Sequence, residues 1–230
     1  MHLYETHLHT YPVSKCARTS PKDAVEFYKS QGYSGIFVTN HFLDGNINID
    51  KSLPYHERLE FYFSDYKEAK RIGDSVGLSV FLGVEMSYRG TDFLIYGLDE
   101  SWYFAHPEIE EMKKSELLSF LAESGALVIQ AHPFREAAYI DHIRLFPRRV
   151  HGVEIINASR NDFENELAKG YAKSYKLIPF AGSDNHNCAV ITKLAGVKSH
   201  IAVESERNFV SLVKSGQMRV FRKGIDSIAD

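Results

Sequence analysis

The sequence has little of what disulfide-rich, membrane-spanning or nucleic-acid-binding proteins are made from. Its 230 residues include two cysteines, Cys16 and Cys188, too few for a disulfide framework, which favours a reducing cytoplasm. No apolar run reaches the length of a membrane span, and the first residues lack the basic and apolar regions of a signal peptide. A formal net charge of -3 gives no basic surface for nucleic acid. We therefore expect a cytoplasmic protein with neither a membrane nor a nucleic-acid partner.

The chain instead has the composition and patterning of one globular α/β domain. It is 44% hydrophobic and 25% charged, and its length suffices to bury a large core. We detect no linker and no repeat, so residues 1–230 form one expected domain. Alternation of short apolar runs with helical periodicities predicts the α/β class. Helices are expected at 21–31, 55–76, 107–124, 162–175 and 206–214, and strands at 4–10, 35–39, 78–83, 93–97, 126–130, 152–156, 178–182 and 200–203.

His7 and His9 form an H-x-H pair in the first predicted strand. Residues two apart on a strand share a face, so both imidazoles would project to the same side. Neutral imidazole is a common metal ligand, and a rigid strand would hold such a pair in place. By itself this pair is weak support for a metal site, because strand histidines also occur by chance on surfaces and in cores.

Further potential ligands follow the other apolar strands, at the edge where α/β proteins build their sites. The mixture of imidazole and carboxylate suits zinc, manganese or iron better than calcium, which prefers oxygen. The set exceeds the needs of one tetrahedral ion, so it favours a cluster with a bridging carboxylate. The alternative is a group of buried polar residues that satisfy one another. Together with the first pair, the candidates are His7, His9, His41, Glu85, His132, Asp184 and His186.

Two more candidate ligands each have an equally weighted structural explanation. Asp92 begins a strand that would pair with the preceding one as a hairpin, which places it near Glu85. It could bind metal, or simply cap the turn. Cys16 could be a soft ligand, or a small buried hydrophobic residue.

Three arginines and one glutamate complete the candidate site. Arg135 follows His132 closely, and its planar guanidinium could bind phosphate in a bidentate manner, or it could pair with neighbouring acids at the surface. Arg18 and Arg160 could add to an anion-binding site, although a structural role is favoured for each. Glu154 ends a strand and could orient a ligand histidine, or be a plain strand-end charge.

The motifs that carry these residues occur in a recognisable order. H-x-H-T, T-N-H, G-V-E, A-H-P-F-R, a second G-V-E and G-S-D-N-H extend from Glu5 to about His186. This order resembles the polymerase and histidinol phosphatase (PHP) superfamily, and most of all its small stand-alone members, the histidinol-phosphatase-like phosphoesterases. The resemblance implies a distorted (β/α)7 barrel whose carboxyl edge holds two or three divalent metal ions.

The resemblance also implies a role for each candidate ligand. Glu85 matches the carboxylate that bridges the first and second metals, and His132 matches a ligand of the second. The first metal would be held by His7, His9 and Asp184, and the third by His41 and His186.

Three positions depart from the common pattern of that superfamily. Asn40 stands where many relatives have aspartate, so a supporting contact to a ligand loses its charge. Asp92 stands where many relatives have histidine, which would favour harder ions such as manganese. Cys16 is the nearest candidate where several relatives have histidine, and it would favour zinc or iron; Lys15 beside it could instead replace a cation.

The implied activity is hydrolysis of a small phosphomonoester, histidinol phosphate-like or nucleotide-like, by a metal-activated water that attacks phosphorus in line. Glu85, His186 and Arg135 are the expected catalytic residues: Arg135 would offset phosphate charge, and His186 or His41 would protonate the departing alkoxide. Two alternatives remain: hydrolysis of an amide or lactone, or a weakened binding or regulatory domain, which Asn40 suggests. On sequence grounds, Asn40→Asp should keep or raise activity.

Overall fold

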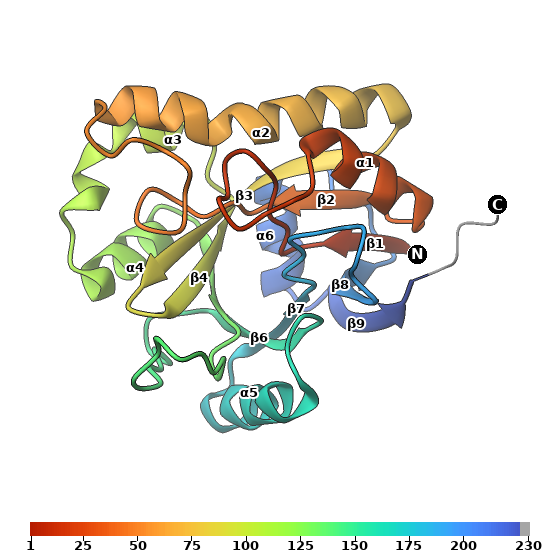
Figure 1. Ribbon diagram of the computed structural model, residues 1–230. Coiled ribbons are helices and arrows are strands. Elements are labelled where there is room, and N and C mark those ends of the chain that lie inside the picture. The colour runs from red at the N-terminus through yellow and green to blue at the C-terminus, as the bar shows by residue number, and fades with distance from the viewer. Residues whose placement is uncertain (226–230) are drawn as a thin grey trace.

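The computed structural model describes residues 1–225 and shows a barrel-like sheet surrounded by helices (Figure 1). In this part of the chain nine strands form one sheet, in the order β7-β6-β5-β4-β3-β2-β1-β8-β9. The strands are β1 (His2–Glu5), β2 (Gly35–Val38), β3 (Ser79–Tyr88), β4 (Thr91–Tyr96), β5 (Leu127–Ala131), β6 (Gly152–Asn157), β7 (Ile178–Gly182), β8 (Lys193–Ser199) and β9 (Arg219–Gly224). The helices are α1 (Pro21–Ser30), α2 (Tyr55–Val76), α3 (Glu100–Ala105), the 3-10 helix η1 (Pro107–Glu110), α4 (Lys114–Glu123), α5 (Asp162–Tyr175) and α6 (Glu206–Lys214).

The first seven strands curve into a nearly closed barrel. Just beyond β1 and β7, Leu8 and Asn185 form a parallel bridge: His9 N–H donates to the Asn185 carbonyl at 2.9 Å, and Asn185 N–H donates to the His7 carbonyl at 3.2 Å. Strand β4 runs antiparallel to both β3 and β5, whereas β5–β6 and β6–β7 are parallel. The reversed strand distorts an otherwise parallel barrel, so the expected fold class is confirmed.

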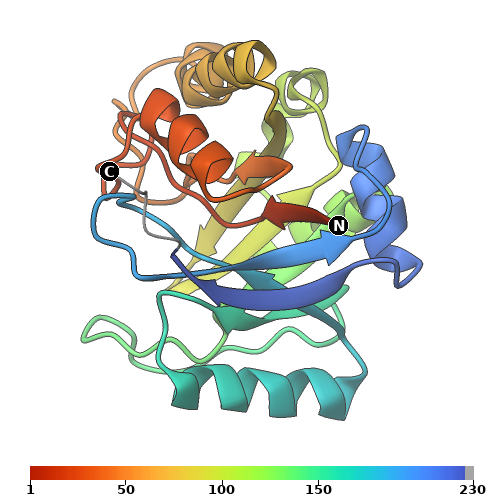
Figure 2. The same ribbon diagram turned by 90° about the vertical axis from the view of Figure 1, so that its right-hand side faces the viewer.

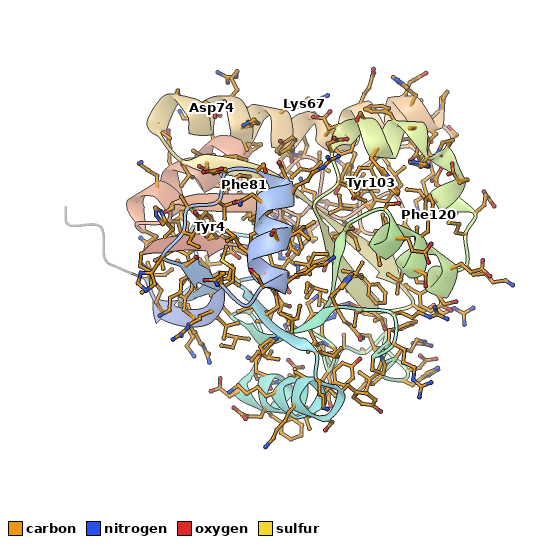
Figure 3. The ribbon with its side chains drawn as sticks, turned by 180° about the vertical axis from the view of Figure 1, so that it is seen from behind. Tyr4, Lys67, Asp74, Phe81, Tyr103 and Phe120 are labelled. Carbon is orange, nitrogen blue, oxygen red and sulfur yellow. The ribbon has the colours of Figure 1, made fainter. Side chains whose placement is uncertain are left out.

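Helices cover the outside of the barrel, and α6 closes the end at which the parallel strands begin. In Figures 1 and 2, α1 and α2 lie on one side of the sheet and α5 on the opposite side. Phe209 of α6 packs against Phe37, Tyr96 and Phe180, which come from β2, β4 and β7, with ring centroids 4.3–6.2 Å apart. Figure 3, seen from behind, shows α6 in front of the sheet near Phe81. This aromatic cluster fills the amino-terminal end of the barrel and leaves the carboxyl end for polar side chains.

Local sequence signals explain the ends of the helices next to the site. The Ser20 hydroxyl accepts the Asp23 N–H at 3.1 Å and so caps α1, which begins at Pro21. The 22-residue helix α2 ends at Val76 and is followed by Gly77, whose φ of 71° is readily adopted by glycine. No helix within the described residues combines the length and apolar character needed to cross a bilayer.

Several predicted elements have different bounds. The strand expected at 4–10 is only His2–Glu5, because the Glu5 carboxylate accepts the N–H groups of Thr6 and His7 (3.0 and 2.9 Å) and turns the chain. His7 and His9 therefore lie beyond the strand. The helix expected at 107–124 is divided into η1 and α4, and 200–203 is not a strand. Helix α3 and strands β8 and β9 were not predicted; β9 mixes charged with apolar residues, and only its Phe221 is buried.

Candidate metal centre

The seven principal candidates meet at the carboxyl end of the barrel. His7 and His9 follow β1, His41 follows β2, and Glu85 lies in β3. His132 follows β5, and Asp184 and His186 follow β7. All but His186 are buried. Three overlapping groups have ligand atoms within 4.8 Å of one another: His9, His41 and His186; His7, Glu85 and His132; and His7, His9 and Asp184.

The distances within one of these groups match those between ligands of a single ion. The Nε2 atoms of His7 and His9 lie 3.2 Å apart. Asp184 Oδ1 lies 3.5 Å from the first and 3.6 Å from the second. Tetrahedral ligands with metal bonds of about 2.0–2.2 Å lie about 3.3–3.6 Å from one another. This group therefore has the spacing of one coordination sphere.

Glu85 lies between the groups in a position that fits a bridging ligand. Its Oε1 is 3.2 Å from His7 Nε2 and 3.4 Å from His132 Nε2, and its Oε2 is 3.4 Å from His9 Nε2 and 2.7 Å from His41 Nδ1. The carboxylate is 1% exposed, and among residues 1–225 neither oxygen accepts a hydrogen bond of standard geometry, although an imidazole nitrogen lies as close as 2.7 Å. A buried carboxylate without well-aligned donors is costly, and metal ions would remove that cost. The residues present thus fit a centre with more than one ion.

Glu154 holds His7 in the tautomer that a metal ligand needs. His7 Nδ1 lies 3.0 Å from Glu154 Oε1, and because a carboxylate accepts, Nδ1 keeps its proton and Nε2 faces the centre as the atom that would bind a metal. Glu154 Oε2 accepts the N–H of His132 at 3.0 Å and Asn157 Nδ2 at 2.9 Å. One buried carboxylate therefore positions two candidate ligands.

The electrostatics of the cluster also suit cation binding. Burial lowers the pKa of His7, but the carboxylates of Asp184 and Glu154 raise it well above its usual range. Burial raises the pKa of Glu85, yet His41 and His7 lower it well below its usual range. The carboxylates therefore stay ionised and attract cations, so protons and metal ions compete for binding to the cluster.

Cys16 contacts the group nearest the opening of the site. Burial raises the pKa of its thiol, but hydrogen bonds to His186 and His41 outweigh this and lower it to about 6. The rings of His41 and His186 each lie within 4.4 Å of His9, measured between centroids. Cys16 thus contacts two candidate ligands of the proposed third metal, so it is more than an isolated buried thiol.

Asp92 and Arg135 form an ion pair beside the cluster. Arg135 Nη2 lies 3.0 Å from Asp92 Oδ2, and the same oxygen is 3.8 Å from His132 Nε2. Asp92 faces Ser87 in the hairpin register, so the predicted hairpin does bring it to the site. Arg135 pairs with Asp92, while its Nε has no hydrogen-bond partner within the described residues.

A cavity of about 580 Å³ opens over this cluster. Asp44, Gly45 and Asn46 of the loop at 43–54 lie along it, together with Arg135 and Tyr139. The other predicted site residues that line it are Cys16, His41, Glu85, Asp92, His132, Asp184 and His186.

The other two arginines lie outside this cavity. Arg160 lines an adjoining cavity of about 480 Å³, which shares Arg135, Asp184 and His186 with the first. Arg18 is exposed, and its guanidinium donates to the Lys15 and Ala17 carbonyls at 3.2 and 2.8 Å. The structure thus brings Arg160 to a cavity beside the candidate ligands. The Arg18 N–H donates to the His186 carbonyl at 2.7 Å, but its side chain lines neither cavity.

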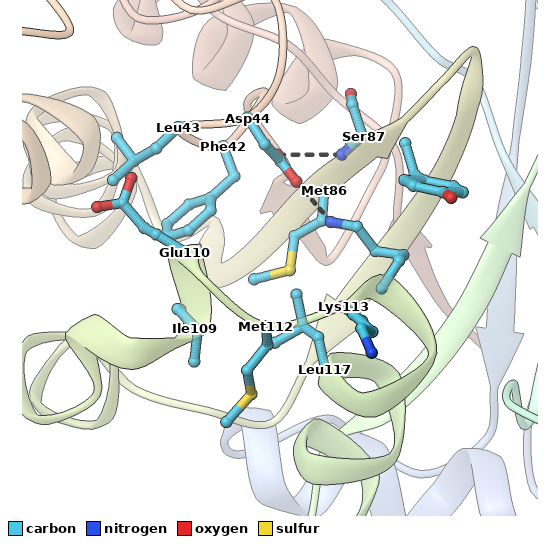
Figure 4. Close-up of a pocket in the computed structure, with 12 residues that line it drawn as sticks. Phe42, Leu43, Asp44, Met86, Ser87, Ile109, Glu110, Met112, Lys113 and Leu117 are labelled. Atoms are coloured by element: carbon cyan, nitrogen blue, oxygen red, sulfur yellow. Dashed lines mark hydrogen bonds and ion pairs between the residues drawn. The ribbon is translucent and has the colours of Figure 1, made fainter.

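A third, more apolar cavity of about 360 Å³ lies between β3 and α4 (Figure 4). It shares Asp44 and Ser87 with the cavity over the cluster. Asp44 accepts the Ser87 N–H at 3.1 Å and pairs with Lys114 at 2.7 Å. These contacts form a polar boundary between the two cavities.

Sequence reasoning missed several residues that support the ligands. Ser14 contacts His9, and Asn157 contacts both Glu154 and Asp184. Asp65 lies on the buried side of α2, at 2% exposure. Its position three residues after Tyr62 and four before Ala69, both buried, puts an acid in an apolar stripe. That pattern could have identified Asp65.

No protein-family model matches the chain, and no curated protein sequence matches it significantly. Its fold is nevertheless similar to that of solved structures, one of which contains a predicted PHP-like metal-dependent phosphoesterase. The chain therefore has the PHP-like phosphoesterase fold.

Three solved structures illustrate this likeness. A two-domain Bacteroides vulgatus protein with a predicted PHP-like metal-dependent phosphoesterase has a TM-score of 0.68 at 14% identity, over 95% of this chain and 64% of that one. A Bifidobacterium adolescentis protein, proposed to be a metal-dependent phosphoesterase, has a TM-score of 0.56 at 13% identity, over 80% and 87%. An amidohydrolase from Chromobacterium violaceum, with bound sulfate and no metal, has a TM-score of 0.56 at 11% identity, over 94% and 97%.

Proposed function

We propose that this protein is a PHP-superfamily hydrolase that uses two or three divalent ions, zinc, manganese or iron, to hydrolyse a small phosphomonoester. The observation that carries the proposal is Glu85, a buried carboxylate that lies among four imidazoles and makes no hydrogen bond of standard geometry within the described residues. The fold and the neighbouring cavity support it. We further propose a cytoplasmic location, consistent with the two free cysteines.

The side chains around the cavity have distinct roles in this proposal. When bound, the metal ions would lower the pKa of a water molecule and offset the charge of the phosphate. Arg135 binds the equatorial phosphate oxygens, and its pairing with Asp92 fixes the guanidinium at the wall of the cavity. His186, with a side chain 31% exposed, is reachable from the cavity and, where only two ions are bound and it is not a metal ligand, protonates the departing alkoxide.

The adjoining cavities shape the substrate class in this proposal. A cavity of about 580 Å³ suits a metabolite rather than a polymer. Arg160, in the neighbouring cavity, would contact the part of the substrate beyond the phosphate. A histidinol phosphate-like or nucleotide-like monoester meets these requirements. The formal net charge of -3, which gives no basic surface for nucleic acid, also favours a small substrate.

Phosphate release from a panel of phosphomonoesters, measured with zinc, manganese or iron, tests this function. The proposal predicts metal-dependent release that is removed by a chelator. Arg135→Ala should raise KM far more than it changes metal content, because Arg135 binds phosphate and contacts no metal. A panel that releases no phosphate with any of the three metals would contradict the proposal.

A second candidate is hydrolysis of an amide or lactone, because one structural neighbour is described as an amidohydrolase. A nucleophilic water held by the same ligands could attack a carbonyl carbon. Esters, lactones and amides assayed beside the phosphomonoesters distinguish the two. Metal binding with no hydrolysis of either panel would instead favour a binding or regulatory domain.

A further inference from the structure

Asp65 is a buried acid that does not contact the candidate ligands directly but is linked to one of them through hydrogen bonds. It lies on α2, and its Oδ2 accepts hydrogen bonds from Thr10 Oγ1 at 2.8 Å and Val13 N–H at 3.2 Å. Asn40 Nδ2 lies 3.4 Å from the same oxygen. These donors compensate a charge that would otherwise be costly to bury.

The hydrogen bonds that start at Asp65 allow one assignment of their protons. A carboxylate only accepts, so the Thr10 hydroxyl gives its proton to Asp65. Thr10 Oγ1 must then accept from Asn40 Nδ2, which lies 2.9 Å away. This orients Asn40 so that its Oδ1 accepts the N–H of Thr10 at 2.7 Å. The orientation of the Asn40 amide therefore satisfies both the charge on Asp65 and the Thr10 N–H, which can only donate.

The same order of donors continues to a candidate metal ligand. Asn40 Oδ1 also accepts from the Ser14 hydroxyl, at 2.9 Å. Because the Ser14 hydroxyl gives its only proton to Asn40, Ser14 Oγ must accept its other hydrogen bonds. These come from His9 Nδ1 at 3.2 Å and from the His41 N–H at 3.1 Å. His9 therefore carries its proton on Nδ1, and its bare Nε2 faces His7, Glu85 and Asp184.

We propose that Asp65 is a positioning residue that fixes the tautomer of His9 through Thr10, Asn40 and Ser14, and supplies the negative charge that Asn40 lacks. Outer carboxylates of this kind make a histidine ligand more basic and orient its ring. Here the carboxylate comes from helix α2 instead of the position next to His41. The inference rests on the cluster binding metal, and it does not depend on which bond is hydrolysed.

This arrangement explains why position 40 holds an amide. The site needs a donor toward Thr10 Oγ1 and an acceptor toward Ser14, and asparagine provides both. A carboxylate at position 40 would place a second acceptor about 3.4 Å from Asp65 Oδ2, where no proton is left for it. Asn40→Asp alone should therefore reduce stability and metal affinity, which revises the expectation from sequence. Paired with Asp65→Asn, it moves the charge to position 40 and restores donors and acceptors along the path from Thr10 to His9, while the Val13 N–H loses its acceptor.

The test makes two measurements on the full chain. Zinc affinity is measured by calorimetry or chelator competition, and the tautomer of His9 is determined in metal-free protein by ¹⁵N NMR. In the wild type the His9 proton should be on Nδ1. Asp65→Asn should weaken zinc binding by about tenfold or more, as loss of an outer-shell partner does. The double variant Asn40→Asp/Asp65→Asn should bind zinc within about threefold of the wild type, because it retains one negative charge and the order of donors and acceptors from Thr10 to His9.

Tyr62→Phe is the matched control, because it also removes a buried hydrogen bond between α2 and Asn40. The Tyr62 hydroxyl donates to the Asn40 carbonyl at 2.9 Å, outside the path from Asp65 to His9. It should lower the melting temperature and leave zinc affinity and the His9 tautomer unchanged. A proton on Nε2 of His9 in the wild type would overturn the proposal. The proposal would also be overturned if Asp65→Asn bound zinc with the wild-type affinity, or if the double variant bound zinc no more tightly than Asp65→Asn. It would be overturned as well if Tyr62→Phe weakened zinc binding as much as Asp65→Asn does.

Discussion

Glu5 should make the metal-free protein less stable as the pH rises through neutrality, and Glu5→Gln should remove this dependence. Glu5 is fully buried beneath the cluster, and its Oε1 accepts the N–H groups of Thr6, His7 and Ser183 at 2.9–3.0 Å. Burial raises its pKa from an ordinary value of 4.5 to about 7, although hydrogen bonds from Ser183 act in the opposite direction. Glutamine keeps an oxygen for the three N–H groups and carries no charge.

The size and sign of this effect follow from proton linkage. Between pH 4.5 and 7 the folded chain holds the Glu5 proton that the unfolded chain has lost, so the free energy of unfolding falls as the pH rises. At about 1.4 kcal/mol per pKa unit, the full loss is about 3 kcal/mol, of which about 2.5 kcal/mol falls between pH 5 and 8. For a chain of this length that corresponds to about 5–10 °C in melting temperature.

Urea unfolding of metal-free protein at pH 5, 6, 7 and 8 measures this effect directly. The stability of Glu5→Gln relative to the wild type should increase by about 2.5 kcal/mol from pH 5 to pH 8. Glu26→Gln changes an exposed glutamate on α1 and serves as the control, with no comparable trend. A constant difference between Glu5→Gln and the wild type over this range would refute the reasoning.

Three further predictions concern the cluster and the core. His132→Ala and Asp184→Asn should each abolish hydrolysis and lower metal content while circular dichroism stays unchanged, and activity that survives either change would show that these ligands are wrongly assigned. Removal of metal should lower the melting temperature, because an ion at 100 times its dissociation constant stabilises the fold by about 2.7 kcal/mol; calorimetry with and without chelator would reveal equal values if no ion binds. Phe209→Ala should destabilise the protein by about 3–5 kcal/mol in urea, because it empties the aromatic cluster in the barrel, and a loss below 1 kcal/mol would mean that α6 does not support the barrel.

The buried strands of the barrel could be predicted from sequence, whereas β8 and β9 could not. Runs such as Gly35–Val38 and Leu127–Ala131 are wholly buried, and each leaves a continuous apolar signal. Strand Arg219–Gly224 is mostly exposed and mixes charged with apolar residues, so its pairing with β8 depends on tertiary contacts that no local pattern encodes. The division of 107–124 into two helices was missed for the same reason.

The candidate ligands were predictable because each follows an apolar strand, but the residues that orient them were not. Ser14 lies in a turn, and its contacts with His9 and Asn40 join segments 5 and 26 residues apart. Asp65 is 55 residues from Thr10 in sequence. Such contacts are set by the packing of α2 against the loop after β1. For Arg18 a structural role was favoured over anion binding, and its guanidinium donates to local carbonyls.

The central claim is that strand ends from across the chain build one multinuclear metal centre. An X-ray structure of the protein grown with zinc or manganese, with anomalous diffraction collected at that metal's absorption edge, tests this most directly. The account predicts at least two anomalous peaks, one in contact with His7, His9 and Asp184 and one in contact with His132, with Glu85 touching both. Peaks confined to surface histidines, with Glu85 free of metal, would contradict it.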